Sequence, residues 1–157
     1  AQLVFNDERV ERGFGLRIWV CVSDAFEVRR LIKAVIESID GSPCDIKELD
    51  PLQRYLQEKL RGKRFLLVLD DVWNENYEKW DGFRNSLKVG AKGSVVIVTT
   101  RIEKVALIMA TLPIYHLDYL SDENSWLLFK QRSFLMESEE GYSRLERIGK
   151  QIVLKCG

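Results

Sequence analysis

Cysteine and histidine are scarce in this sequence of 157 residues, which contains three cysteines and one histidine. The thiols of Cys21, Cys44 and Cys156 are widely spaced and form no Cys-x-x-Cys pair. A zinc site needs clustered thiol and imidazole ligands, and a disulfide framework needs an even set of cysteines. The sequence therefore argues against both and is typical of a protein from a reducing compartment, for which we predict the cytoplasm.

The sequence also lacks an excess of charge of either sign and any long apolar run. Its 24 basic and 24 acidic side chains cancel, whereas nucleic-acid-binding domains usually carry net positive charge. No segment is apolar over the length of a membrane span, and the first residues show no signal-peptide pattern. With 46% hydrophobic and 31% charged residues, the composition is that of an ordinary globular domain. We expect no nucleic-acid partner and no transmembrane segment.

An initiating methionine is absent as well. Residues 1–6 carry Leu3, Val4 and Phe5 with no capping residue before them. This is the pattern of a helix whose first turn lies outside the sequence. We therefore expect the chain to be a fragment of a longer protein.

The most informative stretch covers residues 64–73, where five apolar residues, 65–69, are followed by Asp70 and Asp71. An unbroken apolar run of this length indicates a strand that is buried on both faces, as in a parallel sheet covered by helices. Ligands of such sheets bind beyond the carboxyl ends of the strands. Two carboxylates there are suited to a hard cation such as Mg²⁺. The alternative is that Asp70 caps a turn and Asp71 is merely solvated.

Strand and helix patterns alternate along the rest of the chain. Strand patterns cover residues 16–22, 65–69, 94–100 and 114–117. Helical patterns follow the signals at residues 24–27, 50–51, 74–76, 100–103 and 121–123, a last one runs through residues 145–153, and residues 136–141 have the composition of an exposed acidic loop. This alternation predicts an α/β layered domain with a mostly parallel sheet.

Arg101 follows the strand pattern at residues 94–100. Thr100 and Glu103 have the spacing of a capping box, which places Arg101 in the first turn of a helix, where the helix dipole disfavours a cation. A bound anion would offset this penalty, and a salt bridge to a neighbouring carboxylate would do so equally well. His116 has no nucleophile or carboxylate pattern around it, so we expect it to be a structural residue of its strand.

Taken together, four blocks of the sequence resemble the nucleotide-binding (NB-ARC) domain of plant nucleotide-binding leucine-rich-repeat disease-resistance proteins. The blocks cover residues 13–26, residues 63–73 with a Walker B pattern, residues 93–101 ending in Thr-Thr-Arg, and residues 115–134. Trp73 after the two aspartates resembles the coiled-coil class of these receptors. The resemblance implies a P-loop NTPase-like α/β fold and a slow Mg²⁺-dependent ATPase that acts as a switch, off with ADP and on with ATP.

The resemblance also implies roles for individual residues. Asp70 would position Mg²⁺ at the nucleotide phosphates, and Asp71 would orient the hydrolytic water as the catalytic residue. Thr100 and Arg101 would lie at the nucleotide, with Arg101 sensing the γ-phosphate. The implied partners are the nucleotide, the coiled-coil and leucine-rich-repeat domains of the same receptor, and a pathogen effector or a guarded host protein.

The sequence departs from the family at both ends. No Gly-x-x-x-x-Gly-Lys-Ser/Thr segment occurs in it, so the phosphate-binding loop and first strand are missing, and the Gly-Leu-Pro-Leu motif is missing too. We predict a partial nucleotide-binding domain over residues 1–118, the start of a helical subdomain over residues 119–157, and poor nucleotide binding by this chain alone.

Two functions of other classes compete with this hypothesis. A phospho-acceptor receiver domain also has an Asp and a Thr at neighbouring strand tips, here Asp70 and Thr99, but the Lys it needs beyond the next strand is replaced by His116-Leu117-Asp118. The other alternative is a non-catalytic interaction module that uses tryptophans such as Trp126 as a partner surface.

Overall fold

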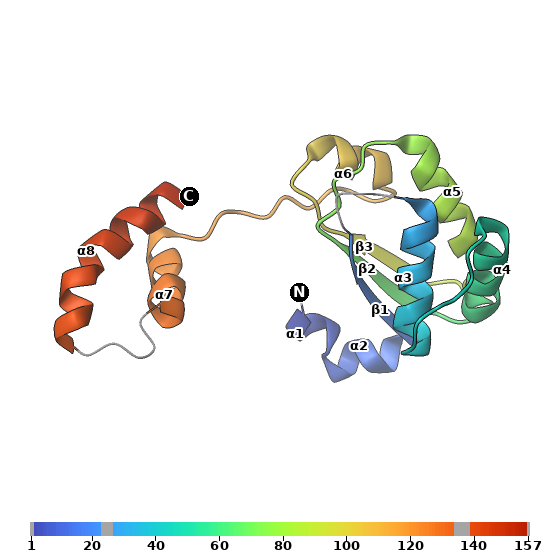
Figure 1. The fold of residues 1–157 in the computed structure, drawn as a ribbon, viewed down its shortest axis with the longest axis horizontal. Helices are drawn as coiled ribbons and strands as arrows, with labels where there is room; N and C mark the ends of the chain where they lie inside the picture. Colours follow the sequence, from blue (N-terminus) through green and yellow to red (C-terminus); the bar gives the residue numbers. More distant parts are fainter. Residues whose placement is uncertain (1, 23–26, 134–138, 157) are drawn as a thin grey trace. The chain divides into compact units, whose positions relative to one another are not determined.

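The computed structural model describes residues 2–22, 27–133 and 139–156 of the chain, with side chains left aside for residues 139–144 and 156. It divides into two compact units, Ala1–Ile114 and Tyr115–Gly157 (Figure 1). The predicted boundary lies a few residues later, at residue 118. That the second unit begins a separate helical subdomain stays a prediction.

The first unit is built on a parallel sheet of three strands, β1 (Leu16–Cys21), β2 (Phe65–Asp70) and β3 (Val95–Val98), in the order β1-β2-β3. The register pairs Ile18 with Leu67 and Leu67 with Val96. All five apolar residues of β2 are buried, as their unbroken run predicts. The predicted α/β fold with a parallel sheet is therefore confirmed.

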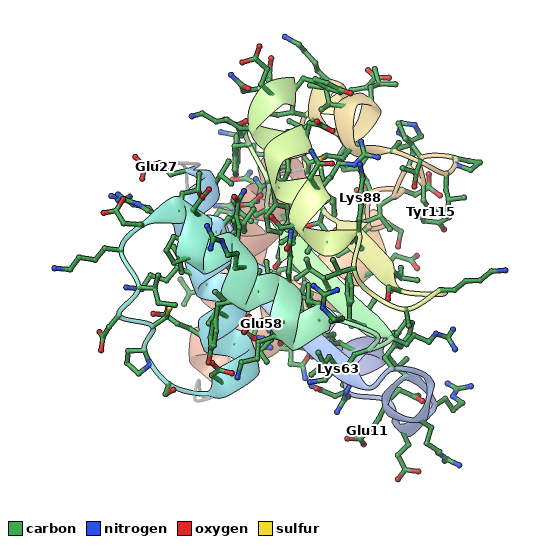
Figure 2. All side chains as sticks on the ribbon, turned by 90° about the vertical axis from the view of Figure 1, so that its right-hand side faces the viewer. Glu11, Glu27, Glu58, Lys63, Lys88 and Tyr115 are labelled. Carbon is green, nitrogen blue, oxygen red and sulfur yellow. The ribbon has the colours of Figure 1, made fainter. Side chains whose placement is uncertain are left out.

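Three helices, α3 (Val28–Asp40), α4 (Leu49–Leu60) and α5 (Tyr77–Leu87), cover one face of this sheet (Figure 1). Each contributes a stripe of apolar residues at helical spacing, since such a stripe is what a helix can bury against a sheet. The fully buried side chains of these helices are Ile32, Val35, Ile36, Leu52, Leu56, Leu60, Trp80 and Phe83. Figure 2 looks onto α4 from outside, with the exposed Glu58 on the outer surface of that helix.

Two short helices, α1 (Gln2–Phe5) and α2 (Glu8–Gly13), lie against the other face of β1. Phe5 packs edge-on against Trp19 with ring centroids 5.3 Å apart. The guanidinium of Arg17 donates to the carbonyl of Phe5 and to a carboxylate oxygen of Glu11, both at 2.8 Å. Sequence patterns did not predict α2, because its one apolar side chain, Val10, makes no stripe at helical spacing and only the cap at Asp7 marks its start.

Helix starts are the least accurate of the predictions. The α4 helix begins at Leu49 with Glu48 as its N-cap residue, so the predicted start at Asp50 and Pro51 is wrong, and Asp50 lies in the first turn. The N-cap residue of α3 is Glu27, whose side chain makes no capping hydrogen bond. The helix signal at residues 24–27 is a predicted capping box of Asp24 with Glu27, and Asp24 lies outside the described residues.

The strand predicted at residues 114–117 does not form. Residues 110–121 have no helix or strand, and Tyr115 and Leu117 are highly exposed. A strand exists only through its ladder of hydrogen bonds, and within the described part of the chain no segment pairs with this one. The apolar pattern alone therefore gave a wrong prediction here.

The second unit is a pair of packed helices, α7 (Asp122–Ser133) and α8 (Glu139–Cys156). Trp126 and Phe129 stack with ring centroids 5.9 Å apart, and Gly149 lets α8 approach them closely. Since α8 begins at Glu139, residues 139–141 are helical and not part of the predicted acidic loop. The rest of the predicted loop, residues 136–138, lies outside the described residues.

One charged cluster ties α3 to α4. Lys59 Nζ lies 2.6 Å from Asp40 Oδ1, and the hydroxyl of Tyr55 donates to Asp40 Oδ2 at 3.0 Å. The Lys59 hydrogen bond is the main reason that the pKa of Asp40 lies below its ordinary value, and the same bond raises the pKa of Lys59. This cluster holds the C-terminal end of α3 against the C-terminal half of α4.

Two Gly→Ala substitutions should change stability in opposite directions. A Cβ at Gly90 would lie 2.4 Å from the Cε1 atom of Phe65, a buried core side chain, whereas a Cβ at Gly82 has no heavy atom within 4 Å. Gly90→Ala should cost about 1–3 kcal/mol through overpacking. Gly82→Ala, inside α5, should add up to about 1 kcal/mol through helix propensity. Denaturant unfolding measures both, and a destabilised Gly82→Ala or a neutral Gly90→Ala would contradict this packing.

The Asp40–Lys59 pair should stabilise the fold only over a limited pH range. The lowered pKa of Asp40 means that its contribution is present above its unfolded pKa and is lost as pH falls through the folded value. The raised pKa of Lys59 has the opposite pH dependence: its contribution to the free energy of unfolding is present below its unfolded pKa and is lost as pH rises through the folded value. The unfolding free energy of the chain minus that of Lys59→Met should therefore be flat near neutrality and shrink below about pH 4.

Lys92→Met, at an exposed lysine in the loop after α5, is the matched control for that measurement. It should show no comparable loss at low pH. If the Lys59→Met difference persists unchanged in acid, the pair does not contribute through its charges.

Candidate functional site

Polar residues gather at one edge of the sheet, where the carboxyl ends of its strands meet. Because the strands are parallel, Cys21, Asp70 and Val98 all end at this edge. We call it the carboxyl rim and define it by residues 21–22, 70–73 and 99–101. Backbone bonds hold it together: Val22 N donates to Asp70 O, and Val72 N donates to Thr99 O, both at 2.9 Å. Asp70 and Arg101 therefore emerge at a common edge of the sheet.

Asp70 ends β2 at the rim and is partly buried. Its Oδ1 atom accepts a hydrogen bond from the hydroxyl of Thr99 at 2.5 Å. Among the described residues, no lysine or arginine lies within ion-pair distance of Asp70. Its carboxylate therefore has a neutral hydrogen-bond donor but no cation to balance its charge.

Asp71 has a left-handed backbone, with φ of 57°. Aspartate enters this region more easily than most residues because its short side chain bonds locally. Its backbone N–H donates to Thr99 Oγ1 at 2.9 Å. The turn directs the chain away from the strand and leaves the Asp71 carboxylate about half exposed at the rim.

Arg101 lies just before α6 (Glu103–Met109), whose N-cap residue is Ile102. It is therefore not in the first helical turn, and the dipole argument from the sequence does not apply. Its Nε atom lies 3.7 Å from Asp71 Oδ1, and its guanidinium lies 6.0 Å from the ring centre of Trp73. The Arg101 side chain is 78% exposed. An ion pair this long and exposed contributes little, about 0–1 kcal/mol.

Thr100 contacts Val72 and Ile102 and not its predicted capping partner, Glu103. Its hydroxyl donates to Val72 O at 2.6 Å and accepts from Ile102 N at 3.1 Å. The predicted capping box with Glu103 is wrong, since the bond goes to the residue two positions on. The structure shows Thr100 joining the turn after β2 to the start of α6, and its role at the nucleotide stays a prediction.

Sequence reasoning assigned the site role to Thr100 and gave Thr99 none in the favoured hypothesis. The signal was present in the pattern: side chains alternate along an extended chain, so two threonines after a strand cannot both face the neighbouring strand tip. Which of the two faces Asp70 depends on the register of β3 against β2.

The donor chemistry of the rim fits a hard cation. Mg²⁺ is bound through one or two carboxylates, with water and substrate phosphates completing its shell. Asp70 offers a carboxylate of that kind, with no cationic partner among the residues that the structure describes. No group of three or more His, Cys, Asp or Glu side chains with metal-binding geometry occurs in the described ranges.

The match to known families decides between the hypotheses. A family model described as NB-ARC domain matches residues 1–139. The chain belongs to the NB-ARC family. The resemblance drawn from the four sequence blocks is thereby confirmed, together with the P-loop NTPase-like fold class. NB-ARC domains bind nucleotide, which supports ADP or ATP as the general ligand class of this family.

Known relatives agree with this family. Disease resistance protein RGA2 of Solanum bulbocastanum is 56% identical over the whole chain, which covers 16% of that protein. Disease resistance RPP13-like protein 4 of Arabidopsis thaliana is 40% identical over 99% of the chain, which covers 18% of it. The NB-ARC chain thus spans about a sixth of the length of such relatives. None of its described helices combines the length and apolar composition needed to cross a membrane.

Proposed function

We propose that the chain supplies the metal- and phosphate-facing edge of an ADP/ATP-binding switch in a plant immune receptor. The observation that carries this proposal is the meeting of Asp70, Asp71 and Arg101 at the carboxyl rim, with Asp71 and Arg101 3.7 Å apart. Two anions and one cation at one sheet edge are the groups that phosphoryl chemistry needs for metal binding, water positioning and charge neutralisation.

Asp70 is the proposed Mg²⁺ ligand, because its carboxylate is at the rim and has no cationic partner among the described residues. The bound metal would neutralise charge on the nucleotide phosphates. Asp71 is the proposed catalytic residue that orients the hydrolytic water. Its carboxylate is about half exposed and therefore accessible to water.

Arg101 is the proposed sensor of the γ-phosphate. A guanidinium binds phosphate oxygens in a bidentate geometry, and Arg101 is free to do so because its pair with Asp71 is weak and exposed. A nucleotide can shift a conformational equilibrium only by contacts that differ between the two states. A contact from Arg101 to the γ-phosphate exists with ATP and not with ADP, so it provides such a difference.

The role of the whole receptor follows from relatives named as disease resistance proteins. We propose that the switch acts in plant defence signalling in the cytoplasm. Its partners would be the coiled-coil and leucine-rich-repeat domains of the same receptor and a pathogen effector or guarded host protein. The receiver-domain alternative is disfavoured by the NB-ARC match over residues 1–139.

The 157-residue chain alone should bind nucleotide poorly. Its sequence contains no Gly-x-x-x-x-Gly-Lys-Ser/Thr loop, and backbone N–H groups of that loop provide most phosphate contacts in this class of site. Isothermal titration calorimetry with Mg-ATP and with ADP should show no micromolar binding. Micromolar affinity for either nucleotide would overturn the prediction that the loop is required.

In the full-length protein that carries these residues, Arg101→Gln should reduce the preference for ATP over ADP. A charge-assisted hydrogen bond contributes about 1.5–3 kcal/mol, so the ratio of the two affinities should fall roughly tenfold or more. Arg54→Gln is the matched control, because Arg54 also makes a single exposed ion pair, 3.4 Å from Asp50 on α4. Equal ratios for wild type and Arg101→Gln would remove Arg101 from the sensing role.

A further inference from the structure

One residue outside the assigned site residues holds the whole turn that carries the two acids. Thr99 N donates to Leu69 O at 3.0 Å, and Thr99 O accepts from Val72 N at 2.9 Å. Its hydroxyl accepts from Asp71 N at 2.9 Å and donates to Asp70 Oδ1 at 2.5 Å. Residues 69–72 are thus each bonded to Thr99, two through its backbone and two through its side chain.

The proton on this hydroxyl has a defined direction. A backbone N–H is only a donor, so Thr99 Oγ1 must be the acceptor in its bond with Asp71. The single hydroxyl proton is then available for Asp70 Oδ1, which must accept it. The chain of bonds therefore runs from the Asp71 amide through Thr99 to the Asp70 carboxylate.

This arrangement fixes the orientation of the Asp70 carboxylate and leaves its charge in place. One oxygen, Oδ1, is occupied by Thr99, and no described residue donates to the other oxygen, Oδ2. Because a hydroxyl is neutral, it orients the carboxylate without cancelling its charge. A lysine or arginine in the same place would cancel that charge. A metal ligand requires a carboxylate oxygen that is fixed in place and keeps its charge. Hydrogen-bond donors next to metal-binding carboxylates orient them in this way in general.

We propose that Thr99 is a positioning residue for the metal ligand Asp70 and for the turn at Asp71. This inference rests on the proposed function, in which Asp70 binds Mg²⁺. It predicts that the Thr99 hydroxyl sets the affinity for Mg²⁺ at the nucleotide, and that it acts through Asp70 without contacting the metal.

A purely structural role for the hydroxyl is the competing explanation, and β3 provides a control for it. At the opposite end of this strand, Ser94 Oγ accepts from Phe65 N at 3.2 Å and donates to Ala91 O at 2.7 Å. Ser94 Oγ also lies 3.5 Å from Lys63 O, a second backbone carbonyl that can accept from it. Ser94 and Thr99 therefore each accept from a backbone N–H at an end of β2 and donate their hydroxyl proton to a second partner. They differ in the acceptor, a backbone carbonyl for Ser94 and the Asp70 carboxylate for Thr99.

The experiment compares Thr99→Val, Thr99→Ser, Ser94→Ala and Asp70→Asn in the full-length protein. The first readout is the Mg²⁺ concentration that gives half-maximal binding of a fluorescent ATP analogue. Because a reversible loss of folded protein would itself raise this midpoint, the variants are compared at a temperature at which circular dichroism shows each of them to be fully folded. The second readout is amide hydrogen exchange at Asp71 without metal or nucleotide, which reports the bond from its N–H to Thr99.

Thr99→Val should raise the half-saturating Mg²⁺ concentration about ten- to a hundredfold and speed exchange at Asp71. Thr99→Ser, which retains the hydroxyl, should bring both the Mg²⁺ midpoint and the exchange rate at Asp71 back close to their wild-type values. Ser94→Ala should leave the Mg²⁺ midpoint at its wild-type value. If Thr99→Val does not fold, Thr99→Ala removes the same hydroxyl without adding a methyl group.

The result that overturns the inference is a wild-type Mg²⁺ midpoint in the variant without the hydroxyl, or an equal shift in Ser94→Ala. Asp70→Asn separates this failure from failure of the proposed function. If Asp70→Asn loses the Mg²⁺ dependence while Thr99→Val keeps it, only the role of Thr99 is wrong. If Asp70→Asn itself keeps the wild-type dependence, the proposed metal ligand is wrong and the inference fails with it.

Discussion

The parallel pairing of β2 with β3 is the constraint on which the rest of the site depends. Because the two strands run in the same direction with Leu69 opposite Val98, their polar ends lie at one edge. An antiparallel partner would have carried its polar end to the far side of the sheet. The bonds from Thr99 to residues 69–72 continue this ladder beyond the strands and join two segments that lie far apart in the sequence into one rim.

The acids of this protein are held in two different ways. Asp40, which joins α3 to α4, has a lysine nitrogen 2.6 Å away and a lowered pKa, so its charge is used within the fold. At the rim, the hydrogen-bond partner of the Asp70 carboxylate among the described residues is the neutral Thr99 hydroxyl, and Asp71 has a cation 3.7 Å away in an exposed pair. This contrast is electrostatic support for placing the ligand site at the rim, since a balanced carboxylate attracts a cation weakly.

Strand β3 has an apolar composition although its side chains are partly exposed. Val95, Val96 and Ile97 have the apolar, β-branched composition of a central parallel strand, yet they are 39%, 38% and 46% exposed. Within the described residues, β3 has a strand neighbour on one side only. The failed strand at residues 114–117 has the same physical origin, because a strand pattern needs a partner to become a strand. The opposite error occurred at α2, a helix that forms but was not predicted, because it has no apolar stripe to detect.

By itself, the sequence determined the alternation of elements, the burial of β2, the family and the presence of Asp70, Asp71 and Arg101 at strand ends. These features depend on apolar periodicity and on local motifs, which can be read without knowing what packs where. Only the tertiary structure decided that Thr99 faces Asp70 while Thr100 faces Val72, and that Arg101 precedes α6 and pairs with Asp71. Those choices depend on the register between strands that lie far apart in the chain, and no local pattern specifies that register.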